Sequence, residues 1–257
     1  MKKLIPLLLM LVAMPSMAQR QFDIEVIIFK RAVDAEQTAE SWPMTQPQID
    51  LERAGSFSDT SYRSKKGVQM LPYSAYELTG EAAKLKKHAG FEVLMHKAWR
   101  QGDQGRFGAP TFHIQAGSDF SSKFNADGSM IGTEIQDQAL EGITEESIPK
   151  PLYQLDGKLQ IYVEHYLYAD VELDLKAPSV REVTLETADQ TELNQELSDQ
   201  EQVVQVGLME DVTPTVHKQE FLKSYRFDQK RRMRSTETHY LDHPLMGVIV
   251  QVRRVNQ

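Results

Sequence analysis

Alternating apolar and polar positions predict the strands of this chain. Residues 20–31 (RQFDIEVIIFKR) alternate and then become continuously apolar over residues 26–29. A strand that is apolar on both faces is covered on both sides, so a central buried strand is expected here. Residues 91–99 (FEVLMHKAW) alternate in the same way, and residues 109–117 predict a shorter strand.

A helix is predicted between the first two of these strands, over residues 81–89. Thr79 is placed to cap its N-terminus, and Gly90 fits the position after its last turn. Strand, helix and strand in this order suggest a split βαβ arrangement. An α+β sheet with a helix packed on one face follows from it.

The longest alternation runs over residues 159–175. The odd positions are apolar except for His165, whereas the even positions carry Tyr162, Tyr166, Tyr168 and several acids. Seventeen residues at about 3.3 Å each give a strand of roughly 56 Å, far beyond the usual length. The strand is therefore expected to bend, after a turn at residues 156–157.

The C-terminal region predicts a long hairpin. Residues 218–232 alternate, residues 246–252 form a last strand, and residues 242–247 (DHPLMG) form a turn, so the polar tip lies between residues 240 and 247. The predicted fold class is α+β: one or more antiparallel-rich twisted sheets, a helix on one face, a long bent strand and this hairpin.

Two polar segments interrupt the pattern. Residues 32–67 predict a long loop, in which Trp42 is expected to anchor the chain to the core. Residues 181–211 contain seven acids between residues 182 and 201, which predicts an exposed, mobile insertion. Both segments are expected to belong to a single domain over residues 19–257.

The first eighteen residues predict export. A short basic segment precedes eleven apolar residues (4–14), and Ser16 and Ala18 are small enough for a signal-peptidase site after Ala18. The apolar run is too short to span a bilayer, which takes about 20 residues, and no later run reaches that length. A cleaved signal peptide (1–18) and a soluble mature protein are therefore expected.

The composition narrows the chemistry. The chain has no cysteine, which excludes disulfides, a cysteine nucleophile and the acylated cysteine of a bacterial lipoprotein. The formal charge of −8 becomes −10 once the two lysines of the signal peptide are removed, which argues against general nucleic-acid binding. No phosphate-binding or nucleophile-elbow motif is present, and no cofactor is expected.

A local basic cluster stands out against this acidic background. Arginine forks match carboxylates bidentately, and aromatic rings stack on sugars. Candidate contacts for carboxylates are Arg231, Arg232 and Arg234. Candidate contacts for sugar faces are Tyr166, Tyr168 and Trp99. The alternative is that the arginines only pair across strands with the acidic face of the long strand.

The sequence HYLDHP supplies two histidines and an aspartate. His239, Asp242 and His243, with Glu237, could hold a metal, but Pro244 places the histidines at a strand end and turn. The preferred interpretation gives His239, Asp242 and His243 a structural role in hydrogen bonding the turn, with no metal.

A hydrolase is a further alternative. The carboxylates of Glu164, Asp170 and Glu172 could cleave glycosidic bonds, although their regular alternation is typical of a solvated strand face. Ser147 and Lys150 match a penicillin-recognising S-x-x-K pattern, but Pro149 between them disfavours the helix that this chemistry needs. The protein is therefore expected not to be an enzyme.

Four blocks together resemble one known family: FDIEVIIFKR, LMHKAWRQ, LQIYVEHYLYADVELDL and RRMRSTETHYLDHPLMGVIVQV. They resemble the CsiV family of periplasmic peptidoglycan-binding proteins. The resemblance implies a non-catalytic periplasmic factor for peptidoglycan assembly and cell shape. It also implies a partner, an outer-membrane lipoprotein that activates a class A penicillin-binding protein. A pure protein–protein adaptor, with residues 181–211 as a docking arm, stays open as an alternative.

Overall fold

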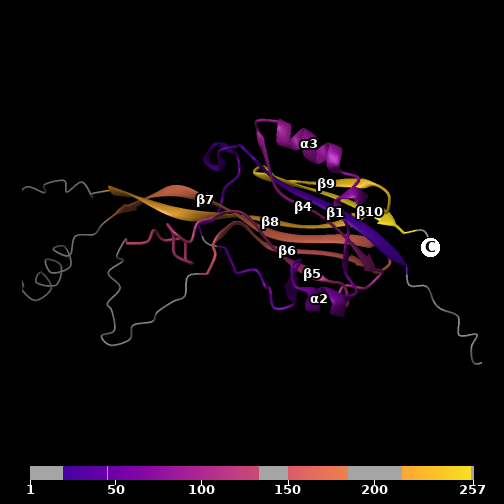
Figure 1. Cartoon of the computed structure of the whole chain (residues 1–257). Coiled ribbons are helices and arrows are strands. Elements are labelled where there is room, and N and C mark those ends of the chain that lie inside the picture. Colours follow the sequence, from indigo (N-terminus) through magenta and orange to yellow (C-terminus); the bar gives the residue numbers. More distant parts are fainter. Residues whose placement is uncertain (1–19, 45, 133–149, 185–215, 256–257) are drawn as a thin grey trace, which may run out of the picture. The chain divides into compact units, whose positions relative to one another are not determined.

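The computed structural model describes residues 20–44, 46–132, 150–184 and 216–255 (Figure 1). The predicted signal peptide and most of the predicted acidic insertion lie outside the described residues. The chain divides into two compact units. Unit 1 comprises Met1–Gly117, Gln154–Leu175 and Tyr225–Gln257, and unit 2 comprises Ser118–Tyr153 and Lys176–Ser224.

Strands dominate the described residues, in agreement with the predicted α+β class. The strands are β1 (Gln21–Arg31), β2 (Ala54–Ser56), β3 (Gln69–Met70), β4 (Phe91–Gly102), β5 (Thr111–Asp119), β6 (Tyr153–Val163), β7 (Leu167–Thr184), β8 (Val216–Met233), β9 (Thr238–Asp242) and β10 (Met246–Arg254). The helices are α2 (Thr60–Lys66) and α3 (Thr79–Lys87), with 3-10 turns η1 (Ala35–Gln37) and η2 (Tyr73–Ala75). None of the helices described here is long and apolar enough to cross a membrane.

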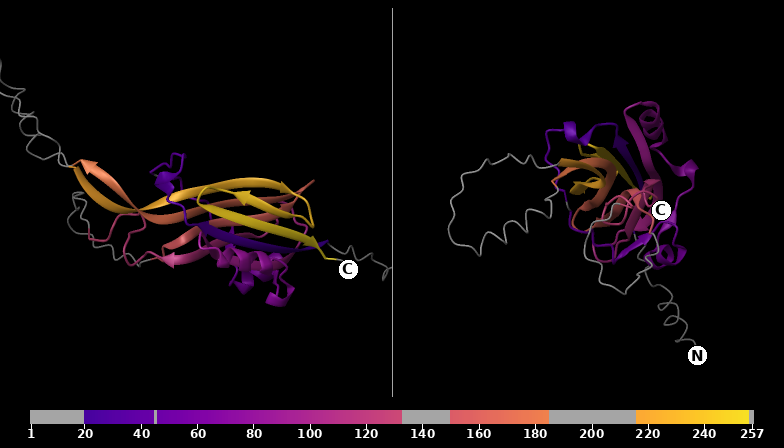
Figure 2. Two further views of the ribbon diagram at one scale, coloured as in Figure 1. Left: turned by 90° about the horizontal axis from the view of Figure 1, so that it is seen from above. Right: turned by 90° about the vertical axis from the view of Figure 1, so that its left-hand side faces the viewer.

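The first sheet has the order β3-β4-β1-β10-β9. Strand β1 lies at its centre and pairs antiparallel with both β4 and β10 (Figure 2). Residues 24–29 of β1 are buried without interruption, which confirms the predicted central strand covered on both faces. One cover is α3, whose Ala82 packs with Leu78 against Ile27 and Phe29.

The second sheet has the order β2-β5-β6-β7-β8. In unit 1 it faces the first sheet across an aromatic core, in which Trp99 of β4 packs against Phe112 of β5 and against Phe57. The Trp99 indole donates to the Gln101 side chain, and the Gln101 amide donates to the Ile161 carbonyl at 2.8 Å. This chain of hydrogen bonds satisfies the polar atoms buried between the sheets.

The split βαβ expectation was wrong. Strands β1 and β4 are direct antiparallel neighbours, so α3 connects two adjacent strands and packs on their sheet. The capping prediction was also wrong, because Thr79 is already helical and the N-cap residue, Leu78, makes no side-chain cap. A carboxylate from β1 binds the segment directly before the helix instead.

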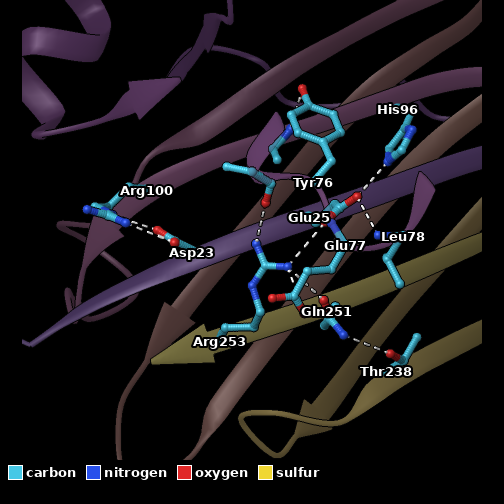
Figure 3. A network of polar contacts seen from close by, with 12 residues as sticks. Asp23, Glu25, Tyr76, Glu77, Leu78, His96, Arg100, Thr238, Gln251 and Arg253 are labelled. Atoms are coloured by element: carbon cyan, nitrogen blue, oxygen red, sulfur yellow. Dashed lines mark hydrogen bonds and ion pairs between the residues drawn. The ribbon is translucent and has the colours of Figure 1, made fainter. Parts of the chain in front are cut away.

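That carboxylate belongs to Glu25, which is fully buried (Figure 3). It accepts hydrogen bonds from the backbone N–H groups of Glu77 and Leu78 at 2.7 and 2.9 Å, directly before α3. His96 Nε2 of β4 lies 2.7 Å away, and Arg253 of β10 approaches at 3.4 Å. A buried carboxylate must be paired and hydrogen-bonded, and Glu25 finds its partners on both neighbouring strands and directly before α3. The network therefore joins β4, β1 and β10 to the start of this helix.

The expected single long strand is a hairpin. Strands β6 and β7 pair antiparallel up to Val163 opposite Leu167, with a turn over residues 164–166. The turn could not be recognised in the sequence, because residues 164–166 include no glycine or proline. A three-residue loop also keeps odd and even positions on the same faces of the two strands. Strand β7 is nevertheless long, with 18 residues.

The two Asp-Gly pairs behave differently. In unit 2, Asp127 and Gly128 form a turn, with Gly128 at φ 85° and the Ser129 N–H donating to the Asp127 carboxylate. The predicted turn at Asp156 and Gly157 lies instead inside β6. A Cβ at Gly157 would stand 2.3 Å from the carbonyl oxygen of Glu172, so this glycine permits close strand pairing rather than a turn.

The C-terminal hairpin consists of β9 and β10, paired from Gly247 opposite Asp242 to Gln251 opposite Thr238. Strand β8 does not join it and belongs to the second sheet. The chain passes from one sheet to the other in a turn at Thr236, which adopts a left-handed φ of 72°.

The polar segment over residues 32–67 holds more regular structure than the predicted long loop, because it forms β2 and α2 in addition to the short turn η1. Trp42 anchors it as expected. The indole donates to Thr38 Oγ1 at 3.0 Å, and the ring packs on Tyr225 and His243 of unit 1.

Unit 2 has its own small apolar cluster of Phe124, Leu152 and Leu222. Asp119 ties its segments together by accepting from the backbone N–H groups of Ser121 and Leu152. These hydrogen bonds lower the pKa of Asp119, because they stabilise the charged carboxylate.

Candidate ligand-binding surface

Tyr166 lies at the tip of the β6–β7 hairpin, where it is 53% exposed. The turn is closed by a hydrogen bond from the Glu164 N–H to the Tyr166 carbonyl at 3.0 Å. Large aromatic side chains usually bury most of their surface, so a ring held open on a short turn is available for contact with a ligand.

Arg232 of β8 covers this ring. Its guanidinium carbon stands 4.4 Å from the Tyr166 ring centroid, which is a cation–π contact. Strand β8 lies beside β7 in the sheet, and this neighbourhood brings together two residues that are far apart in the sequence. The structure thus places two of the predicted contact residues against each other.

Lys230 makes the same kind of contact two residues earlier on β8. Its ammonium lies 5.1 Å from the ring of Tyr168 and 5.5 Å from the ring of Tyr162, and these two rings are stacked. The side chain of Tyr162 and the nearby charge of Asp170 raise the pKa of Lys230, so the ammonium stays charged. We call Tyr166, Tyr168, Lys230 and Arg232 the tyrosine–cation face; Tyr162 is fully buried and supports Tyr168 by stacking on it.

A cavity of about 300 Å³ adjoins Tyr166. Three arginines from distant parts of the chain line it, and we call it the three-arginine pocket. These arginines are Arg20 before β1, Arg234 after β8 and Arg254 at the end of β10. Its other lining residues include Glu164, His165, Tyr166 and Met233.

The charge of this pocket suits a carboxylate. Arg234 is 80% exposed and its only charged contact among the described residues is Glu237, at 3.7 Å. A surface pair of that length contributes little, so the guanidinium can turn to another anion. Arg20 pairs with Asp103 at 2.9 Å and keeps 64% of its side chain exposed.

Two predicted contact residues are elsewhere. Arg231 is exposed, but strand alternation sends it to the opposite side of β8 from Arg232. Trp99 is fully buried between the sheets, so its ring has no face that a sugar could reach. The expected sugar contact of Trp99 is therefore corrected, because its side of β4 packs against the second sheet.

The expected cross-strand pairing uses a different arginine. Arg226 of β8 donates to Asp174 at 2.6 Å and to Glu172 at 3.0 Å, with only 13% of its side chain exposed. Lys158 of β6 also pairs with Glu172, at 2.9 Å. Glu172 and Asp174 of β7 are thus neutralised by Arg226 and Lys158. Arg232 contacts Tyr166 instead.

His239, Asp242 and His243 all accept hydrogen bonds in the C-terminal hairpin or in the turn that precedes it. His239 Nε2 accepts from the Arg234 N–H at 3.0 Å, and His243 Nδ1 accepts from the Leu245 N–H at 3.2 Å. Asp242 accepts from Arg31 and from Tyr240. Burial lowers the pKa of His243, which favours the neutral ring that this acceptor role needs.

The carboxylates named in the hydrolase alternative are dispersed. Glu164 is exposed on the turn, Asp170 faces Arg106 at 3.5 Å, and Glu172 is bound by Arg226 and Lys158. Over the described ranges, no three acids or histidines gather closely enough to hold a metal ion.

Sequence reasoning missed Arg20 and Arg254, because each lies near an end of the described chain, far in sequence from the basic cluster. Their signal was indirect: Arg20 directly precedes β1 and Arg254 ends β10, and these strands pair from Phe22 opposite Arg254. Phe107, in the loop after β4, was missed as well, although it is 80% exposed.

Comparison with known proteins gives one match. A protein-family model described as "Peptidoglycan-binding protein, CsiV" matches residues 3–255, nearly the whole chain. No curated protein and no solved structure matches the chain.

Proposed function

Since the chain belongs to the CsiV family, we propose that it binds peptidoglycan through the tyrosine–cation face and the three-arginine pocket, without cleaving it. Peptidoglycan offers flat sugar rings and peptide carboxylates side by side. Exposed tyrosines and arginines are the side chains that recognise these two groups.

The observation that carries the proposal is the contact between Tyr166 and Arg232 beside a pocket with three arginines. The guanidinium fixes the orientation of the ring, so a sugar meets a rigid platform. Arg234 then stands within the same pocket to receive a carboxylate. In a chain with a formal charge of −8, this local positive charge supports a specific anionic ligand rather than general polyanion binding.

The cellular setting belongs to the same proposal. Residues 1–18 act as a cleaved signal peptide that delivers the protein to the periplasm. There it supports peptidoglycan assembly and cell shape through an outer-membrane lipoprotein that activates a class A penicillin-binding protein. The family match and the resemblance of the four sequence blocks support this setting.

Co-sedimentation with purified sacculi tests the proposal. The protein over residues 19–257 is mixed with sacculi across a salt series, and the supernatant is examined by HPLC for released fragments. We expect binding that weakens with salt, because exposed charges are screened, and no released muropeptides. Sedimentation that is absent at every salt concentration would contradict peptidoglycan binding, and released muropeptides would contradict the non-enzymatic role.

A further inference from the structure

A second cavity, of about 240 Å³, lies in unit 1 beside the loop that joins β4 to β5. Its charged lining residues come from four separate segments. They are Asp50, Arg53, Arg106, Lys158 and Asp170. Phe107 lines it as well and is 80% exposed, which makes it the most exposed of the large hydrophobic side chains described here.

The cavity lies on the same face of the β6–β7 hairpin as the tyrosine–cation face. Gln160 and Asp170, which line it, are cross-strand partners, and the next pair on that face is Tyr162 opposite Tyr168. Two residues along a strand span about 7 Å. A ligand bound at the tyrosines therefore reaches the cavity with a short extension.

The lining combines both signs of charge with an apolar wall. Arg106 and Asp170 face each other at 3.5 Å, a long contact, and the Arg106 side chain is 53% exposed. Arg53 lies over the Phe107 ring at 5.5 Å and donates to the Phe107 carbonyl, which holds this ring at the cavity. A purely anionic group would meet the carboxylates of Asp50 and Asp170, whereas a group with both charges finds a partner for each.

We infer that this cavity binds a zwitterionic α-amino acid terminus carried on an aliphatic chain. Such a terminus has an ammonium and a carboxylate on one carbon. The guanidinium of Arg106 receives the carboxylate, Asp170 receives the ammonium, and Phe107 packs against the methylene groups. The 3.5 Å pair of Arg106 and Asp170 is replaced by two shorter contacts to the ligand.

The inference rests on the proposed peptidoglycan binding and names the part of the polymer that is read. In peptidoglycan, the free end of diaminopimelate in an uncross-linked stem peptide is a zwitterion of this kind. Cross-linking converts its ammonium into an amide and removes the charge that Asp170 would bind. Each cross-link changes the amine of its acceptor stem only, so the protein distinguishes free stems from acceptor stems.

Titration calorimetry with three soluble tripeptide muropeptides tests this selectivity. The first carries diaminopimelate, the second carries lysine at the same position and lacks the carboxylate, and the third carries diaminopimelate with an acetylated side-chain amine. The intact protein is expected to bind the first about tenfold more tightly than either of the others, since each loses one charge-assisted contact.

Single substitutions test whether Asp170 binds the ammonium and Arg106 the carboxylate. Asp170→Asn is expected to remove the preference over the acetylated muropeptide, and Arg106→Gln the preference over the lysine muropeptide. Phe107→Ala weakens all three and cannot disturb the core, because the ring is 80% exposed. The matched control is Arg232→Gln at the other site, which weakens all three muropeptides equally and leaves both preferences intact.

The outcomes separate this inference from the proposal on which it rests. Equal affinity for the three muropeptides, in a protein that sediments with sacculi, overturns the zwitterion site and leaves peptidoglycan binding standing. Failure to bind either sacculi or muropeptides overturns both.

Discussion

Unit 1 contains two groups of charged residues, one buried inside the protein and one exposed at its surface. Around Glu25, the carboxylate is fully buried and meets two backbone N–H groups, His96 and Arg253. On the outer side of the second sheet, Arg232 lies on the open ring of Tyr166 and Arg234 is 80% exposed.

The contrast separates residues that hold the fold from residues that can bind. When a buried charge loses one partner, no water replaces that partner, so the loss is costly. The members of the Glu25 network therefore stabilise the fold and are not free to bind a ligand. An exposed guanidinium on an aromatic ring loses little when a ligand joins it. Changes in the first group should therefore alter stability, and changes in the second should alter binding.

The largest effect is expected for Glu25→Ala. Removing the carboxylate leaves His96 and the N–H groups of Glu77 and Leu78 without their buried partner, at a cost of about 3–5 kcal/mol in the free energy of unfolding. Urea denaturation measures it. Glu92→Ala on the adjacent strand removes a 59% exposed carboxylate, 3.8 Å from Lys30, and should cost less than about 0.5 kcal/mol. Equal losses for the two variants would contradict the structural role of Glu25.

Arg226→Met tests the boundary between the two groups. Arg226 is mostly buried and bridges Glu172 and Asp174, so its loss should lower the free energy of unfolding by about 1–3 kcal/mol. Binding to sacculi should stay within about twofold, provided that folded protein is compared. A folded Arg226→Met protein that no longer sediments would place this arginine in the ligand site instead.

Tyr166→Ala is expected to weaken sacculus binding by about threefold to tenfold, since aromatic stacking contributes about 0.5–1.5 kcal/mol. The melting temperature should not change, because the ring is 53% exposed. Tyr73→Ala, at a 70% exposed tyrosine in η2, is the matched control and should bind as the wild type does. The assignment fails if the two variants bind equally well.

The smallest effect concerns pH. Burial lowers the pKa of His243 from its ordinary value of 6.5, so the unfolded chain takes up a proton before the folded one does. Stability contributed by the neutral ring is present above about pH 6.5 and is lost as the pH falls through the lowered pKa. His243→Gln should flatten this part of the stability–pH curve. An unchanged slope below pH 6.5 would show that other groups cause it.

The sequence predicted the fold class, the central strand and the anchoring of Trp42, because each depends on a local pattern of apolar residues. It failed at the β6–β7 turn, where three loop residues keep odd and even positions on their faces and no turn residue marks the reversal. Glu25 showed no local signal either. Its partners lie up to 228 residues away, in Arg253.

The candidate surface could be predicted only in part, for the same reason. Tyr166 and the basic cluster are conspicuous in the sequence, yet their contact depends on β8 lying next to β7. Trp99 showed the converse error, because alternation gives the two faces of a strand without revealing that a second sheet covers one of them. Arg20 and Arg254 reach their shared pocket only through strand pairing.

The most direct test of the central claim is a charge reversal at the proposed binding surface and at a control surface. Sacculus binding is measured across a salt series for Arg232→Glu/Arg234→Glu and for Lys86→Glu/Lys87→Glu, two exposed lysines at the end of α3 that change the net charge by the same amount. We predict that the arginine variant, still folded, loses at least about tenfold in affinity and most of the salt dependence, while the lysine variant binds like the wild type. Equal affinity of the two variants would contradict the assignment of peptidoglycan binding to the tyrosine–cation face and the three-arginine pocket.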